Sequence, residues 1–341
     1  MPQAKMTTTV VRTAVARLES TCATPTLASS AVAAAKTAES SAQAIQFMLI
    51  WYAREGGYTR IEMKTGRASR TALRVAIRRA AHQMMEDPLI LEDPLVLRLI
   101  GPGYERDLER ASHLVARDFR GFMAARSRYA EDLLAEAVAV GVRQYVVLGA
   151  GLDTFAYRNP HAGLRVFEVD HPATQAWKRE RLAEAGIAVP ESVTFVPLDF
   201  EHRTLAEGLA EAGFDAERTA FFGWLGVVPY LTRAAFEATL RTIGALPEGS
   251  GVCFDYALDP DTLSALRRPV FDALAKRVAA AGEPFQLFFT QDEVERALHE
   301  AGFARVRHAD AAVMNALYFD GRADGLRLSG ESLGQMVVAW V

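Results

Sequence analysis

The chain has 341 residues, of which 50% are hydrophobic, and its formal net charge is −4. This length can bury one large core or two smaller ones, and the composition is that of an ordinary globular protein. The nearly balanced charge and the lack of a strongly basic stripe argue against nucleic acid as a partner. No apolar run approaches the roughly 20 residues of a membrane-spanning helix, so we expect no membrane partner.

The amino-terminal part of the chain differs from the rest in composition. The first 43 residues are rich in Ala, Ser and Thr, and their only acids are Glu19 and Glu39. This composition is typical of a tail outside the fold, and a transit-like leader would share it. We expect residues 1–62 to be a disordered, low-complexity extension and residues 63–341 to form the folded domain.

The two cysteines, Cys22 and Cys253, are too few and too far apart for a disulfide framework or a zinc site. Cys253 lies in an apolar run and is expected to be an inert core residue. We therefore expect a cytoplasmic protein with no metal ligands. The sequence leaves the oligomeric state open.

Hydrophobic periodicity predicts a helical cap over residues 69–140. An amphipathic helix is expected over 69–86, and Asp93-Pro94 opens a short second helix. One or two further helices are expected over 105–140, before Gly141. This segment carries no visible chemistry of its own, so its expected task is to cover a binding crevice.

From residue 144 onward, strands and helices alternate as a doubly wound sheet requires. Apolar runs predict strands at 144–148, 164–170, 193–199, 220–225 and 251–256, with a closing pair at 305–309 and 336–341. Helical patterns separate them at 172–186, 203–212, 232–245, 261–282 and 291–301.

A glycine turn links the first two strands. The first strand ends in Gly149-Ala150-Gly151, and the second ends in the acids Glu168 and Asp170. Neighbouring parallel strands end at one crevice, where glycines admit a ligand and a carboxylate can hold a ribose diol. A dinucleotide fingerprint would need a third glycine where Thr154 stands. The turn therefore favours S-adenosylmethionine, a cationic nucleoside without a pyrophosphate.

The chain resembles the class I S-adenosylmethionine-dependent methyltransferases of the leucine carboxyl methyltransferase type. The resemblance implies a Rossmann-like α/β fold with a doubly wound, mostly parallel seven-stranded sheet, preceded by the helical cap. It covers residues from about 70 to 341 and rests on five ordered motifs: Asp93-Pro94, Ala125-Arg126-Ser127-Arg128-Tyr129, Leu148-Gly149-Ala150-Gly151-Leu152-Asp153-Thr154, Phe167-Glu168-Val169-Asp170-His171-Pro172 and Val228-Pro229-Tyr230-Leu231-Thr232.

The resemblance also implies roles for residues in the cofactor site. The loop Gly149, Ala150 and Gly151 would lie against the methionine part of S-adenosylmethionine. Asp170 would hold the ribose hydroxyls, with Glu168 as the alternative. Asp199 and Phe200 would contact the adenine. Arg126 would pair with the carboxylate of the cofactor, and Arg79 would be a second basic contact.

Each of these assignments has a structural alternative. For Asp170 and Asp199 the alternative is helix capping, and for the two arginines it is a solvated charge on a helix face. One position departs from the family pattern: Leu225 stands where several members carry a Glu. This favours the bacterial small-molecule O-methyltransferases over the enzymes that methylate a protein C-terminus, and leaves that contact to backbone groups or Trp224.

The expected reaction is methyl transfer to a hydroxyl or carboxylate of a small molecule, such as a polyketide-like secondary metabolite. A carboxylate needs no general base, whereas a hydroxyl benefits from one. His82, His113 and His171 are expected to be structural or exposed, so no catalytic residue is named, and Tyr129 and Tyr230 are candidates for the acceptor pocket. The alternatives are a C-terminal carboxyl methyltransferase, a noncatalytic cofactor binder and a nicotinamide-dependent oxidoreductase.

Overall fold

A computed structural model describes residues 69–341, apart from 114–116, 200–202, 266–267, 281–283 and 330–333. The chain divides into the units Met1–Trp51 and Tyr52–Val341, and every described residue belongs to the second. The expected extension, residues 1–62, lies outside the described residues. Its boundary with the folded domain stays a prediction.

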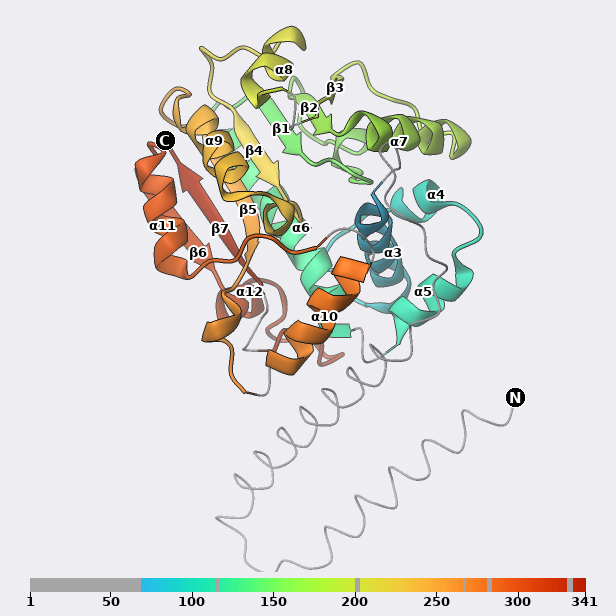
Figure 1. The fold of residues 1–341 in the computed structure, drawn as a ribbon. Coiled ribbons are helices and arrows are strands. Elements are labelled where there is room, and N and C mark those ends of the chain that lie inside the picture. Colours follow the sequence, from blue (N-terminus) through green and yellow to red (C-terminus); the bar gives the residue numbers. More distant parts are fainter. Residues whose placement is uncertain (1–68, 114–116, 200–202, 266–267, 281–283, 330–333) are drawn as a thin grey trace, which may run out of the picture. The chain divides into compact units, whose positions relative to one another are not determined.

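The described strands form one seven-stranded sheet in the order β3-β2-β1-β4-β5-β7-β6 (Figure 1). Strands β1 to β5 pair in parallel, whereas β7 is antiparallel to both β5 and β6. The predicted doubly wound, mostly parallel sheet is therefore confirmed. The strands are β1 (Gln144–Leu148), β2 (Arg165–Asp170), β3 (Val193–Pro197), β4 (Phe221–Trp224), β5 (Gly251–Ala257), β6 (Arg305–Ala309) and β7 (Gly334–Trp340).

Both faces of the sheet are covered, which explains the continuous apolar runs of its strands. Successive side chains of a strand point to opposite faces. Tyr145 and Val147 of β1 therefore pack against α6 and α12, while Val146 and Leu148 pack on the side of α8, α9 and α11 (Figure 1). The helices are α6 (Arg117–Ala139), α8 (Leu205–Glu211), α9 (Arg233–Gly244), α11 (Gln291–Glu300) and α12 (Ala311–Tyr318).

Helices also precede the first strand and pack on α7 (Pro172–Glu184) in a separate apolar cluster. The first of them begins where Ser69 accepts a hydrogen bond from the amide of Ala72, which satisfies an otherwise unpaired amide of the first turn. These helices are α3 (Arg70–Met85), α4 (Val96–Ile100) and α5 (Glu105–Ser112). None of the described helices is both long and apolar enough to cross a membrane.

Two elements differ from the predicted pattern. The single helix expected over 261–282 is instead a short 3-10 turn, Pro260–Thr262, followed by α10 (Arg268–Ala280). Pro269 is tolerated in the first turn of a helix but not in its interior, so α10 begins just before it. Helix α12 was not predicted, although its start carries a signal: Asp310 accepts a hydrogen bond from the amide of Val313 at 2.9 Å.

Candidate functional site

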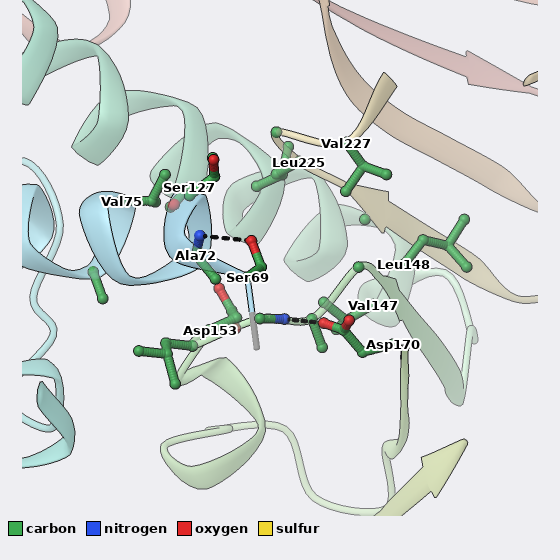
Figure 2. Close-up of a pocket in the computed structure, with 18 of the residues that line it drawn as sticks. Ser69, Ala72, Val75, Ser127, Val147, Leu148, Asp153, Asp170, Leu225 and Val227 are labelled. Atoms are coloured by element: carbon green, nitrogen blue, oxygen red, sulfur yellow. Dashed lines mark hydrogen bonds between the residues drawn. The ribbon is translucent and has the colours of Figure 1, made fainter. Parts of the chain in front are cut away.

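A cavity of about 350 Å³, called the main pocket below, opens where β1, β2 and β4 end beside α3 and α6. Six of the predicted cofactor residues line it: Arg79, Arg126, Gly149, Ala150, Gly151 and Asp170. Figure 2 shows Asp153 and Asp170 on one side of the pocket and Leu225 and Val227 on the other. The crevice at the carboxyl ends of parallel strands is thus a real cavity, as the topology predicts.

The glycine turn forms the floor of the main pocket. The amides of Gly149 and Ala150 donate to the carbonyl of Val169 at 2.8 and 3.1 Å, which ties the turn to β2. Gly149 has φ +65° and Gly151 has φ +44°, a region that side chains disfavour. A Cβ at Gly149 would lie 2.3 Å from a methyl of Val227, so glycine is required here by contact as well as by conformation.

Asp170 shapes the same turn. Its carboxylate accepts the amide of Gly151 at 2.5 Å (Figure 2) and the amide of His171 at 2.7 Å. Burial raises the pKa of Asp170, and these two amides oppose the rise. Glu168, the alternative ribose ligand, is fully buried away from the pocket, where it accepts from Lys178 at 2.8 Å. Of the two acids, Asp170 is therefore the one that can reach a ligand.

Arg79 is fully engaged by protein acceptors. Its Nε and Nη2 donate to one oxygen of Asp93 at 3.1 and 2.5 Å, Nη2 also donates to Thr154 at 3.0 Å, and Nη1 donates to Asp153 at 3.3 Å. Burial would raise the pKa of Asp93, but Arg79 and Arg158 outweigh it and lower the pKa. Arg79 thus fastens α3 to the segment that follows the glycine turn, and we interpret it as a positioning residue.

Arg79→Lys is expected to destabilise the fold more than it weakens cofactor binding. Lysine keeps the charge but cannot bridge the acceptors from one planar group, so we expect a loss of about 2 kcal/mol and a melting point lower by roughly 5 °C. Calorimetric unfolding and titration with S-adenosylhomocysteine measure the two effects, with Arg70→Lys on the same helix as the control. An unchanged melting point with lost binding would instead make Arg79 a direct cofactor contact.

Arg126 joins α6 to the ends of β4 and β5. Its Nη1 donates to Asp255 at 2.9 Å, and the other oxygen of Asp255 accepts the amide of Gly226 at 2.5 Å. The Arg126 side chain is 6% exposed, and its buried Nε has no partner among the described residues. A buried guanidinium N–H without an acceptor is costly. Arg126 also lines the main pocket, where its positive charge would attract an anionic ligand group.

Leu225, which stands where several family members carry a Glu, lines the main pocket. The position of the family's acid therefore lies at the site, although this chain has no acid there. Trp224 does not replace it, because this residue is 2% exposed and stacks on Phe236 in the core with ring centres 5.6 Å apart. Backbone groups of 225–227 remain the polar atoms that this strand end offers.

Asp199 is not brought to the main pocket. Asp199 is absent from the lining, and its carboxylate lies 4.0 Å from the exposed ring of His171. Phe200 lies outside the described residues. The adenine contacts assigned to both stay predictions.

Of the candidate histidines and tyrosines, only Tyr230 lies at the main pocket. His82 is buried and accepts the amide of Ile90 at 3.0 Å, whereas His113 and His171 are exposed, and none of the three lines the main pocket. Tyr129 lies at a different surface hollow, beside Arg307 and Tyr318. Tyr230 does line the main pocket.

A second cavity of about 140 Å³, called the side pocket below, adjoins the main pocket. The two cavities share five lining residues: Thr71, Val75, Arg126, Gly226 and Tyr230. Asp255, which lines the side pocket, was not among the predicted site residues, although it follows an apolar strand run just as Asp170 does. Phe271 and Phe285 also line the side pocket and come from segments with no recognisable motif. No group of acids, histidines and cysteines in the described part of the chain could hold a metal ion.

Known proteins share this sequence pattern and fold. The family model for leucine carboxyl methyltransferase matches residues 72–244. A Bacillus subtilis protein named as an S-adenosyl-L-methionine-dependent methyltransferase, YktD, is 33% identical over 291 residues, covering 77% of this chain and 95% of that protein. A similarly named Mycolicibacterium paratuberculosis protein is 34% identical over 58% of this chain and 39% of its own length. The solved structure of a Thermobifida fusca protein titled as a methyltransferase has a TM-score of 0.51 at 18% identity, covering 81% of this chain and 96% of that one.

Proposed function

We propose a methyl acceptor for this chain, which belongs to the leucine carboxyl methyltransferase family and is an S-adenosylmethionine-dependent methyltransferase. The proposed acceptor is the hydroxyl or carboxylate oxygen of a small molecule. The observation that carries the proposal is the side pocket. It holds about 140 Å³ and meets the main pocket at Arg126 and Gly226. A space of this size suits one or two rings better than a folded protein's C-terminus.

The residues of the main pocket fit the methyl donor. The glycine turn admits close approach, Asp170 offers carboxylate oxygens for a ribose diol, and the guanidinium of Arg126 in the pocket lining suits the carboxylate of an amino acid. S-adenosylmethionine supplies an activated methyl group on its sulfonium. The protein then has to hold the acceptor oxygen in line with that methyl and exclude water.

We propose that the acceptor oxygen is already deprotonated in solution or loses its proton easily. No histidine occurs among the described residues that line the two pockets, and Asp255 is already held by Arg126 and Gly226. A carboxylate or an acidic phenol can accept a methyl group without a dedicated base, whereas a neutral alcohol gains from one. A role in secondary metabolism and a cytoplasmic location belong to the same proposal.

Methyl transfer with labelled S-adenosylmethionine tests the proposal. The full chain is incubated with a panel of small carboxylic acids, phenols and alcohols, and with peptides that end in a free carboxylate, and both labelled product and S-adenosylhomocysteine are measured. Turnover of a small acid or phenol is the expected result. Methylation of the peptides alone would favour the C-terminal carboxyl methyltransferase. Cofactor binding without turnover of any compound would favour a noncatalytic binder, and binding of NAD instead would favour the oxidoreductase.

Arg126→Gln tests the contact to the cofactor carboxylate. We expect S-adenosylhomocysteine to bind at least about 10-fold more weakly, because a charge-assisted hydrogen bond worth about 1.5–3 kcal/mol is lost. The affinity for methylthioadenosine, which lacks the amino acid part, is expected to stay within a few-fold. Asp255→Asn is the control, since it alters the ion pair but keeps the guanidinium. Equal weakening of both ligands by Arg126→Gln would contradict the assignment.

A further inference from the structure

The side pocket has two aromatic walls. Phe119 and Phe122 of α6 form one of them. Phe271 of α10 and Phe285 form the other, and their rings stack with centres 6.3 Å apart and planes inclined by 23°. Tyr230 continues this wall, with its ring centre 5.4 Å from that of Phe285. Phe119, Phe122 and Phe285 are partly exposed, so their faces are available to a ligand.

Among the described residues that line the side pocket, arginines outnumber acids. Its lining includes Arg74 and Arg78 from one face of α3 together with Arg126, and Asp255 is its single acid among the described residues. Asp255 is matched by its ion pair with Arg126. The guanidinium of Arg78 lies 4.7 Å from the ring centre of Phe119, which places a cation directly at the aromatic wall. Arg74 and Arg78 thus bring two guanidinium groups to the pocket lining, which an anionic group would complement.

The pocket is placed to hold the acceptor rather than the donor. The two pockets meet at Arg126, Gly226 and Tyr230, whereas the four phenylalanines of the walls line the side pocket alone. A ring bound between these walls would therefore lie next to the main pocket, in a cavity that Arg74 and Arg78 of α3 also line. Aromatic rings gain from offset-stacked and edge-on contacts beyond the area that they bury, which an aliphatic chain of equal size does not.

From these observations we infer that the methyl acceptor is an anionic aromatic compound, with its ring between the walls formed by Phe119, Phe122, Phe271 and Phe285 and its negative charge matched by Arg74 and Arg78. The inference rests on the proposed function, because it identifies the class of molecule that enters the acceptor side of the same site.

Binding of model ligands to the full chain tests the inference without relying on turnover. The protein is first saturated with S-adenosylhomocysteine and then titrated in a calorimeter with 2-naphthoate, with the neutral 2-naphthamide and with octanoate as an aliphatic anion. We expect 2-naphthoate to bind at least 10-fold more tightly than either of the others. Equal affinities of the three, or no binding of any of them to the loaded protein, would overturn the inference.

Variants separate the two parts of the recognition. Phe285→Ala is expected to weaken 2-naphthoate and 2-naphthamide alike, by about 10-fold. Arg78→Gln and Arg74→Gln are expected to weaken 2-naphthoate while leaving 2-naphthamide within a few-fold. Arg70→Gln, on the same helix but outside the pocket lining, is the control. A loss of naphthoate affinity in Arg70→Gln equal to that in Arg78→Gln would contradict a specific charge contact.

The two proposals fail in different ways. If the unloaded protein does not bind S-adenosylhomocysteine, the donor site itself is wrong, and with it the proposed function. If it binds S-adenosylhomocysteine but shows no preference for the aromatic anion, the inference alone is overturned.

Discussion

Replacing Asp170 with alanine is expected to lower the affinity for S-adenosylhomocysteine by about 100-fold or more. The loss has two sources: a ribose diol would lose its carboxylate acceptor, and the amide of Gly151 would lose the partner that it holds at 2.5 Å. Hydrogen bonds to a charged group are worth about 1.5–3 kcal/mol each, so losing the two that a ribose diol can donate to the carboxylate reaches this factor. Calorimetric titration of the purified variant measures it.

Methylthioadenosine distinguishes the loss of a ribose contact from the loss of a contact to the cofactor carboxylate. Because it keeps the ribose, its affinity should fall in Asp170→Ala as much as that of S-adenosylhomocysteine, in contrast to the result expected for Arg126→Gln. Asp292→Ala, at an exposed acid in the first turn of α11, is the control and should bind normally. If Asp170→Ala keeps its melting point and binds within a few-fold of the unaltered chain, the ribose assignment is wrong.

Gly149→Ala is expected to lose most of its cofactor affinity, by at least about 10-fold. The left-handed backbone at φ +65° costs a side chain roughly 1–2 kcal/mol. The new methyl would also lie 2.3 Å from Val227, so the turn or the end of β4 must move. Both movements alter the floor of the main pocket, and titration with S-adenosylhomocysteine reports them.

Gly163→Ala separates backbone strain from contact. Gly163 has a similar φ of +75°, but a Cβ there would meet nothing within 4 Å. It should therefore lose comparable conformational free energy, visible in the melting point, and retain cofactor affinity. If both variants lose affinity equally, the effect comes from general destabilisation and the close approach at Gly149 is unimportant.

The sheet was largely predictable because its signals are local. A parallel strand buried on both faces appears as a short apolar run, such as 144–148 or 251–256, and turns or capped helices separate the runs. The errors occurred where local signals compete. Residues 261–282 contain enough helix formers to suggest one helix, yet Pro269 sets where α10 begins. Helix α12 was missed although Asp310 caps it.

The site was predictable in part, and the missing part is informative. Asp170 and the glycine turn lie 19 positions apart on adjacent strands, so their meeting follows from the sheet order alone. The partner of Arg126 is 129 positions away, and the acceptors of Arg79 come from 14, 74 and 75 positions away. Such pairings depend on how α3 and α6 dock on the sheet, and helical periodicity says which face is apolar but not where it docks.

By itself, the sequence determined the methyl donor: the glycine turn, the acid at the end of the second strand and the ordered family motifs are features of short segments. The tertiary structure alone decided how Arg79 and Arg126 are held and which residues line the side pocket that we propose for the acceptor. The aromatic walls of the side pocket join α6 to α10 and Phe285, more than 140 positions along the chain. Their chemistry emerges only when packing brings these segments together, because no local conformational preference couples residues so far apart.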